Sequence, residues 1–499
     1  MDTNQASNRP ASFPTPARRQ RMLLTTLLTL LTSRALRPSY LNPHRWISSR
    51  VMSSEPSSLS SNHASRCPVA DTLEGRCPGF EEVFLSQYWQ KKPLLIRNFV
   101  SPVHDKISVS PSMLLDLCLE DDVESRIVAQ MRGKLRKKSG PFRPVDIEHL
   151  QPKNWTLLVQ EVDRHVPAIA DLWDEFFGFI PSWRRDDVMI SYAREGGGIG
   201  AHVDNYDVFL LQARGRRRWS LENAFLTESA ELEREVPGAQ TRLLRDFTAD
   251  QSWELFAGDV LYLPPRVPHQ GVSLDDDCIT ISMGFRAPSH ISLCSAFVEH
   301  VCSGLSAVDM YTDPDLTLQT NVGQVSAKAV GRLQRTIRSE LIDGLDDRDF
   351  NTWLGCYLTT PLRQKPPTRA FFLASDDPSS DSAADGEDDL EEEPLYVRGL
   401  HSVASRRSFG CPEEVLAELR EGSLALRRAE GTRVACIGDE LFIDGEAFRL
   451  PPSSSEQLGR LLSRAAVDTD QLVQVLGDTE GELVLVELLG RGFLYPVDR

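Results

Sequence analysis

The residues of this 499-residue chain that could carry out chemistry lie in two short motifs. The first is His202-x-Asp204, preceded by the glycine-rich run 196–200, and the second is a proline-rich run that ends at His269. In an extended segment, residues two apart point to the same side, so His202 and Asp204 can present an imidazole and a carboxylate to one point. A strand that brings His269 beside them completes the 2-His-1-carboxylate triad, which holds Fe(II) and leaves three coordination positions open.

The residues around both motifs favour a metal site over a chance match. The glycines before His202 remove side chains where the backbone and a ligand must approach closely. The segment Pro264-Pro265-Arg266-Val267-Pro268 follows an expected strand and forms a rigid, extended lead into His269. The alternative, in which the two histidines only make structural hydrogen bonds, is the weaker interpretation.

An oxygenase with such a triad needs a cation for the distal carboxylate of 2-oxoglutarate, and three successive arginines at 216–218 offer one. Strand alternation places Arg217 on the face of Trp219 and turns Arg216 and Arg218 to the other face. A buried arginine is costly without an anion, and a carboxylate that accepts two hydrogen bonds is its natural partner. We expect Arg217 to bind the co-substrate, whereas a solvated basic face suits its two neighbours.

The elements that must position these residues are expected to be strands over 188–285. Short runs rich in β-branched and aromatic residues alternate there with glycine- and proline-containing turns, which predicts a β-sandwich or barrel. Helices are predicted at 111–119 and 155–177. After residue 291 apolar side chains recur at helical spacing, so we expect amphipathic helices that pack on the barrel or on a second subunit.

The last hundred residues are predicted to form a small α+β unit resembling a winged helix. We expect a helix at 412–420, a hairpin over 433–450 that turns at Asp444-Gly445, a helix opened by a capping box of Ser453 and Glu456, a helix at 469–476 and a strand at 493–495. With 11 arginines against 17 acidic residues from position 401 onward, this unit is not expected to bind DNA.

The net charge of −17 favours a basic partner over nucleic acid or an anionic membrane. Its distribution is uneven. The first 54 residues hold eight arginines, no lysine and one acid, which is typical of an organellar transit peptide; we expect a mitochondrial protein, with plastid and cytoplasmic or nuclear locations as alternatives. The apolar run 22–31 is too short to span a membrane.

Ten acids over 375–394 predict an acidic, disordered linker. Nine cysteines without a C-x-x-C pair argue against disulfides or a zinc knuckle.

Three runs, at 186–219, 257–272 and 282–288, resemble the Jumonji C (JmjC, cupin-type) ribosomal oxygenases, and within them the bacterial ribosomal-protein arginyl hydroxylases; the resemblance extends over about residues 79–499. It implies an α+β chain in which a double-stranded β-helix (a jelly-roll barrel) precedes a helical dimerisation region and a winged-helix domain. The expected segments are a leader with a Ser-rich stretch (1–70), the catalytic domain (75–288), the helical region (289–370), the acidic linker (371–398) and the winged-helix-like domain (399–499).

The resemblance also implies roles for individual residues. His202, Asp204 and His269 would be the iron ligands, and Arg217 and Ser191 would bind 2-oxoglutarate. Thr280 stands where the bacterial enzymes carry an asparagine near the co-substrate, which leaves its role in doubt.

The implied activity is an Fe(II)-, 2-oxoglutarate- and dioxygen-dependent hydroxylation of an arginine in a large-subunit ribosomal protein of an organelle, catalysed by a homodimer. Two alternatives stay open. The same oxygenase chemistry would serve a histidyl hydroxylase or a lysyl demethylase, and a non-catalytic chain would serve as a ribosome-assembly binding protein.

Overall fold

The computed structural model describes residues 64–101, 107–237, 242–344, 346–361, 412–449, 452–476 and 479–498. The predicted leader (1–70) and acidic linker (371–398) lie outside these residues, except that residues 64–70 at the end of the leader are described. Among the described residues, no helix combines the length and the apolar character that a membrane span requires.

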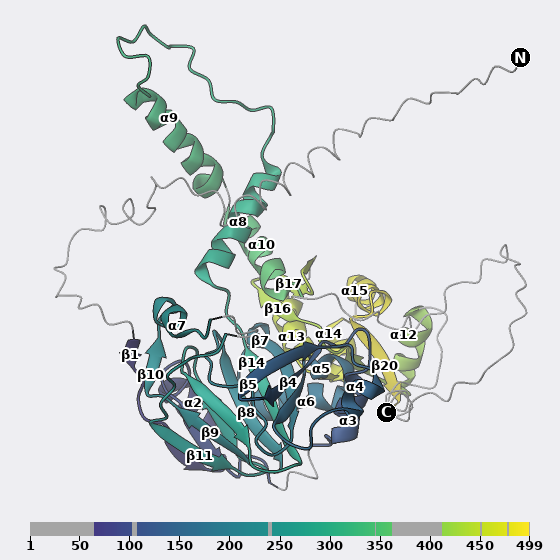
Figure 1. The fold of residues 1–499 in the computed structure, drawn as a ribbon. Coiled ribbons are helices and arrows are strands. Elements are labelled where there is room, and N and C mark those ends of the chain that lie inside the picture. Colours follow the sequence, from purple (N-terminus) through teal and green to yellow (C-terminus); the bar gives the residue numbers. More distant parts are fainter. Residues whose placement is uncertain are drawn as a thin grey trace, which may run out of the picture. The chain divides into compact units, whose positions relative to one another are not determined.

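Two sheets face each other to form the expected double-stranded β-helix (Figure 1). The major sheet has the order β2-β3-β12-β8-β14-β7-β6-β4-β5 and the minor sheet the order β11-β9-β13. The strands are β2 (Asp71–Glu74), β3 (Leu94–Arg97), β4 (Ser125–Met131), β5 (Lys134–Ser139), β6 (Trp155–Val159), β7 (Arg185–Ala193), β8 (Asp207–Arg214), β9 (Arg217–Leu221), β11 (Gln251–Leu255), β12 (Val260–Leu263), β13 (His269–Ser273) and β14 (Cys278–Phe285). A short pair, β1 (Ala64–Arg66) with β10 (Ala224–Leu226), lies beside them in the fold, followed by α7 (Glu228–Arg234).

The central strands of the major sheet are buried on both faces, which explains why they are apolar at nearly every position. In β12, Val260 and Tyr262 pack into the larger core, whereas Leu261 and Leu263 pack into a second core that also holds Trp219 of the minor sheet. The larger core is completed by α2 (Phe80–Gln87), α3 (Pro111–Leu117), α5 (Val162–His165) and α6 (Pro167–Phe177). The helices therefore cover one face of the sheet and leave the other face to the site.

The expected helix at 111–119 is confirmed as α3, but the expected helix at 155–177 is wrong over its first part. Trp155–Val159 form β6, which pairs with both β4 and β7 and has all five residues buried. Helical structure begins only at Val162. A short, continuously apolar run fits a buried strand and a buried helix equally well, so periodicity could not separate them.

The region after the barrel is helical, as its apolar spacing predicts. It contains α8 (His290–Gly304), α9 (Ala327–Arg338), a π-helical turn at Ser339–Asp343 and α10 (Asp347–Thr359). Phe297 of α8 packs edge-on against Trp353 of α10, with ring centroids 5.0 Å apart. Many large apolar side chains of this region stay exposed, among them Ile291, Val330, Leu333, Ile337 and Ile342.

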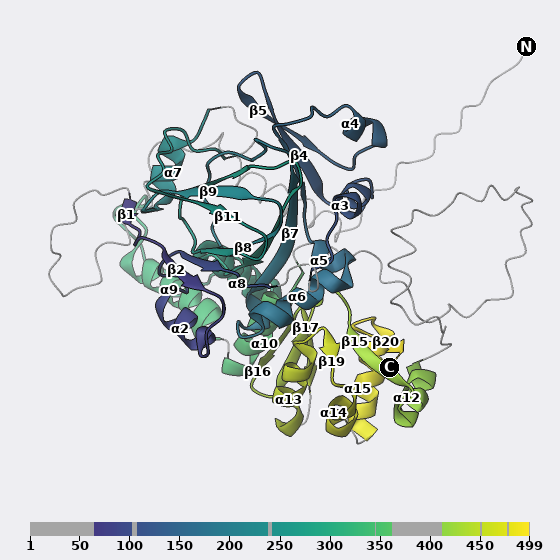
Figure 2. The same cartoon turned by 90° about the horizontal axis from the view of Figure 1, so that it is seen from below.

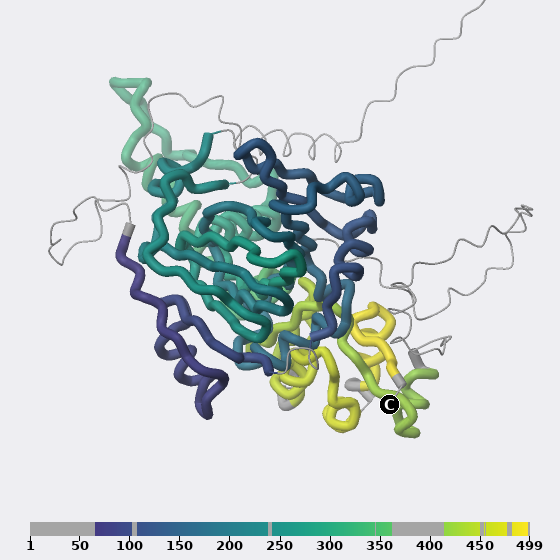
Figure 3. The backbone as a smooth tube through the Cα atoms, turned by 60° about the horizontal axis from the view of Figure 1, so that its bottom comes forward, coloured from purple at the N-terminus to yellow at the C-terminus, as the bar shows by residue number. Residues whose placement is uncertain are grey.

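The C-terminal unit is α+β and has its own core. Its backbone is the yellow-green to yellow part of the tube in Figure 3. Its elements are α12 (Pro412–Glu421), β15 (Leu424–Arg428), β16 (Val434–Ile437), β17 (Glu440–Ile443), β18 (Glu446–Arg449), α13 (Pro452–Leu462), β19 (Ala466–Val467), α14 (Thr469–Val475), α15 (Thr479–Gly490) and β20 (Leu494–Asp498). It contacts the barrel through Arg427, whose Nη2 lies 2.6 Å from Oδ1 of Asp171.

Three details of this unit differ from the sequence predictions. The expected hairpin over 433–450 has three strands, because a further turn at Gly438 precedes the confirmed turn at Asp444-Gly445. The helix α13 begins at Pro452, so Ser453 is inside its first turn and not before it. Helix α15 was not predicted, since its apolar run lacks a clear polar face.

Candidate metal centre and co-substrate pocket

His202 and His269 are joined directly through their backbones. The amide of each donates to the carbonyl oxygen of the other, at 3.0 Å in both directions. A further backbone hydrogen bond joins the same two segments: the amide of Arg266 donates to the carbonyl oxygen of Asp204 at 2.8 Å. These contacts bring the three predicted ligands to one place.

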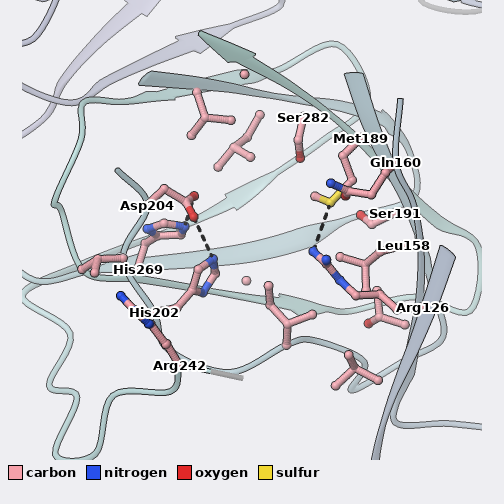
Figure 4. A pocket seen from close by; sticks show the side chains of 18 of the residues that line it. Arg126, Leu158, Gln160, Met189, Ser191, His202, Asp204, Arg242, His269 and Ser282 are labelled. Carbon is pink, nitrogen blue, oxygen red and sulfur yellow. Dashed lines mark hydrogen bonds and ion pairs between the residues drawn. The ribbon is translucent and has the colours of Figure 1, made fainter. Parts of the chain in front are cut away.

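The ligand atoms of His202, Asp204 and His269 lie within 4.8 Å of one another, and this is the only such group found in the described part of the chain. One carboxylate oxygen of Asp204 is 3.5 Å from Nε2 of His269 and the other is 3.9 Å from Nε2 of His202 (Figure 4). Such spacing suits three ligands that share one ion.

The second nitrogen of each ring contacts the backbone. Nδ1 of His202 lies 3.1 Å from the carbonyl oxygen of Gly200, and Nδ1 of His269 lies 2.9 Å from that of Val267. A carbonyl can only accept, so the proton of each neutral ring resides on Nδ1 and the lone pair on Nε2 faces the shared point. Burial, followed by the neighbouring His202, lowers the pKa of His269 to about 4, so this ring is the neutral ligand form at neutral pH.

Two glycines allow the close packing behind the triad. A side chain at Gly271 would place its Cβ 2.8 Å from the ring of Trp219, and one at Gly198 would place its Cβ 2.4 Å from the carbonyl oxygen of Gly271. Trp219 in turn lies beside His269, with ring centroids 5.8 Å apart. The glycine-rich run before His202 therefore works as the sequence predicts, by permitting close backbone approach.

A cavity of about 330 Å³ opens between the two sheets at the triad. Arg217 lines it and is only 4% exposed. Its Nε and Nη2 atoms are buried and have no hydrogen-bond partner in the structure, and its guanidinium lies 5.8 Å from the ring centroid of Trp219. A buried guanidinium with free donors fits an anionic guest that can accept two hydrogen bonds. A buried guanidinium with free donors thus lies in the cavity where the sequence predicts a carboxylate anchor.

The structure brings Ser191 to this cavity but does not place Thr280 on its wall. Ser191 is buried on β7 and lines the cavity. Thr280 is its partner in the register with β14, and its hydroxyl donates to Oε1 of Gln212 at 2.9 Å. Thr280 therefore contacts the buried side chain of Gln212 and does not line the cavity.

Asp187 and Tyr206 are among the further polar residues that line the cavity and that were not identified from the sequence. Asp187 lies on β7 four residues before Ser191, and Tyr206 follows Asp204 by two residues. A side chain at Gly284 would place its Cβ 3.5 Å from Oδ1 of Asp187 and 3.6 Å from the ring of Tyr206, so both border the gap that this glycine leaves. The alternation that places Ser191 inward also places Asp187 inward, and this was the available signal.

The charge of these two residues is shaped by burial and by neighbouring carboxylates. Burial, followed by Asp186, raises the pKa of Asp187 to about 7. The carboxylate of Asp204, followed by burial, raises the pKa of Tyr206. A cationic guest beside Asp187 would restore the ionised carboxylate, because an opposite charge favours the charged form.

Comparisons with known proteins agree with this architecture. Residues 171–293 match the family model described as a JmjC domain. The chain is 30% identical over 417 residues to "Ribosomal protein uL16 3-hydroxylase" of Escherichia coli, covering 83% of this chain and 96% of the relative. It is 37% identical over 239 residues to "Probable ribosomal oxygenase" of Haemophilus influenzae, covering 48% of this chain and 55% of that relative.

Solved structures of the Escherichia coli ribosomal oxygenase YcfD are also similar to this chain. An X-ray structure of Escherichia coli YcfD aligns with a TM-score of 0.66 at 29% identity, covering 83% of this chain and 97% of that one. A structure of the ribosomal oxygenase YcfD in complex with cobalt and 2-oxoglutarate aligns over the same shares with a TM-score of 0.63 at 28% identity.

Replacement of Arg217 tests the carboxylate anchor. We expect Arg217→Gln to weaken 2-oxoglutarate binding by roughly 100-fold, because it removes the buried cation that would pair with the distal carboxylate. Calorimetric titration of the manganese-loaded protein with 2-oxoglutarate measures this. Arg218→Gln is the matched control, since Arg218 is exposed on the opposite face and pairs with Glu254 at 2.7 Å. Equal affinities of the two variants would contradict the assignment.

Proposed function

Because the chain belongs to the JmjC ribosomal oxygenase family, we propose that it is an Fe(II)- and 2-oxoglutarate-dependent hydroxylase of an arginine side chain in a large-subunit ribosomal protein. The observation that carries this proposal is the combination, in one cavity, of the His202, Asp204 and His269 triad with the buried, unpartnered guanidinium of Arg217.

Each part of the cavity has a defined task in this reaction. The bound Fe(II), together with 2-oxoglutarate and dioxygen, supplies the oxidation that replaces a C–H bond with C–OH. His202, Asp204 and His269 would hold the ion, and a triad of this kind leaves coordination positions open to the co-substrates. Arg217 and Ser191 orient the distal carboxylate of 2-oxoglutarate. The enclosing sheets position the reacting groups and exclude water.

The preference for arginine rests on Asp187 and Tyr206. A guanidinium can donate two parallel hydrogen bonds to the Asp187 carboxylate, and its planar group can stack on the Tyr206 ring in the gap beside Gly284. A neutral imidazole gains less from a buried carboxylate, and a methylated ammonium lacks the planar, two-donor geometry. These properties support arginine over the histidyl and lysyl alternatives.

Mass spectrometry of a recombinant uL16-type ribosomal protein tests the proposed activity. After incubation with the enzyme, Fe(II) and 2-oxoglutarate, we expect one oxygen added to one arginine, and no product with His202→Ala. We expect Asp187→Asn to lower kcat/KM for the protein substrate roughly 100-fold, because it removes the carboxylate that would pair with the guanidinium.

Asp275→Asn is the control for that variant and should keep the wild-type kcat/KM, since Asp275 does not line the cavity and pairs with Arg216 at 3.0 Å. Oxygen on a histidine, or methyl loss from a lysine, would overturn the arginine assignment. Ribosomal-precursor binding that survives His202→Ala, with no product from the wild-type enzyme, would favour the non-catalytic alternative.

We also propose that the chain forms a homodimer through its helical region. The support is the apolar stripe of Val330, Leu333 and Ile337 on α9, whose side chains are 41%, 45% and 59% exposed. Contiguous exposed apolar surface of this kind is typical of a protein–protein interface.

Light scattering at micromolar concentration tests the dimer. We expect twice the chain mass for the wild-type protein and the single-chain mass for Leu333→Glu/Ile337→Glu, because two charges would have to be buried at the interface. Arg335→Glu, on the opposite side of the same helix, should remain dimeric. A wild-type monomer would rule out this proposal.

For the location we propose the mitochondrion, on the strength of the arginine-rich, acid-poor first 54 residues. A fluorescent protein fused to the C-terminus should enter mitochondria with the full chain and stay outside them when the chain starts at Met52. Imaging in plastids, or an unchanged distribution without the leader, would favour the alternatives.

A further inference from the structure

The hairpin of β4 and β5 is strongly basic, whereas the chain as a whole is acidic. Residues 132–138 (RGKLRKK) hold five cations and no acid, in a protein whose net charge is −17. Strand β5 is the last strand at one edge of the major sheet, and the hairpin can be followed at that edge in Figure 2. A basic strip therefore lies on an acidic protein at an unpaired sheet edge.

The two faces of β5 differ. Lys137 lines the cavity of the metal site, and the side chain of Leu135 approaches Gly200 of the glycine-rich run. Lys134 and Arg136 alternate with them on the opposite, exposed face, and Arg132 is exposed in the turn. The hairpin thus borders the cavity mouth on one face and presents cations to solvent on the other.

These three outward cations have no acidic partner. No carboxylate of the described residues lies within ion-pair distance of Arg132, Lys134 or Arg136, whereas the adjacent Lys138 pairs with Asp146 at 2.7 Å. Residues two apart on a strand are roughly 6.6 Å apart, so the cations form a spaced row. Such a row fits a partner with regularly repeated negative charge.

Edge strands often carry a lysine that prevents pairing with other strands. That role accounts for one or two cations. It does not account for three outward cations, Arg132, Lys134 and Arg136, that have no acidic partner among the described residues. The row also repels a free basic ribosomal protein, which is the substrate proposed above. The partner that satisfies both observations is the RNA to which a ribosomal protein binds.

We propose that the β4–β5 hairpin contacts the phosphate backbone of RNA, so that the enzyme acts on its ribosomal-protein substrate while that protein is bound to RNA. This inference rests on the proposed function. The strip offers no exposed aromatic side chain for base stacking, so the contact is electrostatic and independent of RNA sequence.

RNA binding by the full-length protein tests the surface. We would titrate a fluorescently labelled ribosomal RNA fragment, the one bound by the substrate protein, between 50 and 200 mM salt. The triple variant Arg132→Gln/Lys134→Gln/Arg136→Gln should bind roughly tenfold or more weakly at low salt. For this variant, the slope of log K against log salt should be less negative by about 2, because each of the three lost phosphate contacts contributes about 0.7 to the slope.

A matched triple variant controls for net charge. Arg449→Gln/Arg460→Gln/Arg464→Gln removes three exposed arginines from the C-terminal unit and should bind RNA like the wild-type protein. The proposal is overturned if the wild-type protein does not bind RNA, if the hairpin variant keeps the wild-type salt dependence, or if the control variant loses affinity instead. It is also overturned if polyglutamate of equal charge binds as tightly as RNA, which would indicate an acidic protein partner.

Activity assays separate this inference from the proposed function. On the free ribosomal protein, the hairpin variant should hydroxylate at least as fast as the wild type, because its side chains point away from the cavity and the cations that repel the basic substrate are gone. On the same protein bound to RNA, its rate should fall along with its RNA affinity. Absence of hydroxylation on either substrate refutes the proposed function, whereas equal rates of the variant and wild type on the RNA-bound protein refute the hairpin inference alone.

Discussion

The pair of backbone hydrogen bonds between His202 and His269 is the contact on which the whole site depends. It joins a glycine-rich loop to the first residue of β13, and β13 then pairs along β9 with His269 opposite Leu221, Gly271 opposite Trp219 and Ser273 opposite Arg217. The positions of the proposed metal ligand His269 and the proposed carboxylate anchor Arg217 are thus set by the same pair of strands. Because strand spacing is fixed, the distance between them does not depend on loop conformation.

Trp219 links the two ends of that ladder. Its ring lies beside His269 and beneath the guanidinium of Arg217, with both separations near 5.8 Å, and it occupies the space that Gly271 leaves open. An aromatic ring held on three sides keeps both functional groups in fixed positions without a polar contact of its own. The orientation of Arg217 therefore comes from packing, and its donors remain available to a guest.

The sequence was sufficient for features that depend on neighbours along the chain. Strand alternation and the i, i+2 relation pointed to His202, Asp204 and the inward face of Arg217, all of which line the cavity, and turn residues marked the ends of most strands over 188–285. It was insufficient where the outcome depends on pairing between distant strands. Trp155–Val159 became a strand because β4 and β7 flank it, and Asp187 and Tyr206 meet only across the gap at Gly284. Thr280 shows the same limit, since the Gln212 amide and not the cavity is its partner.

Charge is informative in this protein only when each side chain is considered with its surroundings. The value of −17 predicts a basic partner, yet among the described residues the buried arginine of the cavity has no acidic partner and neither does the row of cations at the sheet edge. The groups proposed for catalysis face the cavity between the two sheets, where packing fixes their geometry. The surfaces proposed for partners sit at β5 and α9, where the fold leaves backbone edges or apolar faces uncovered. Burial thus separates the groups that need exact placement from the surfaces that must remain open to a second molecule.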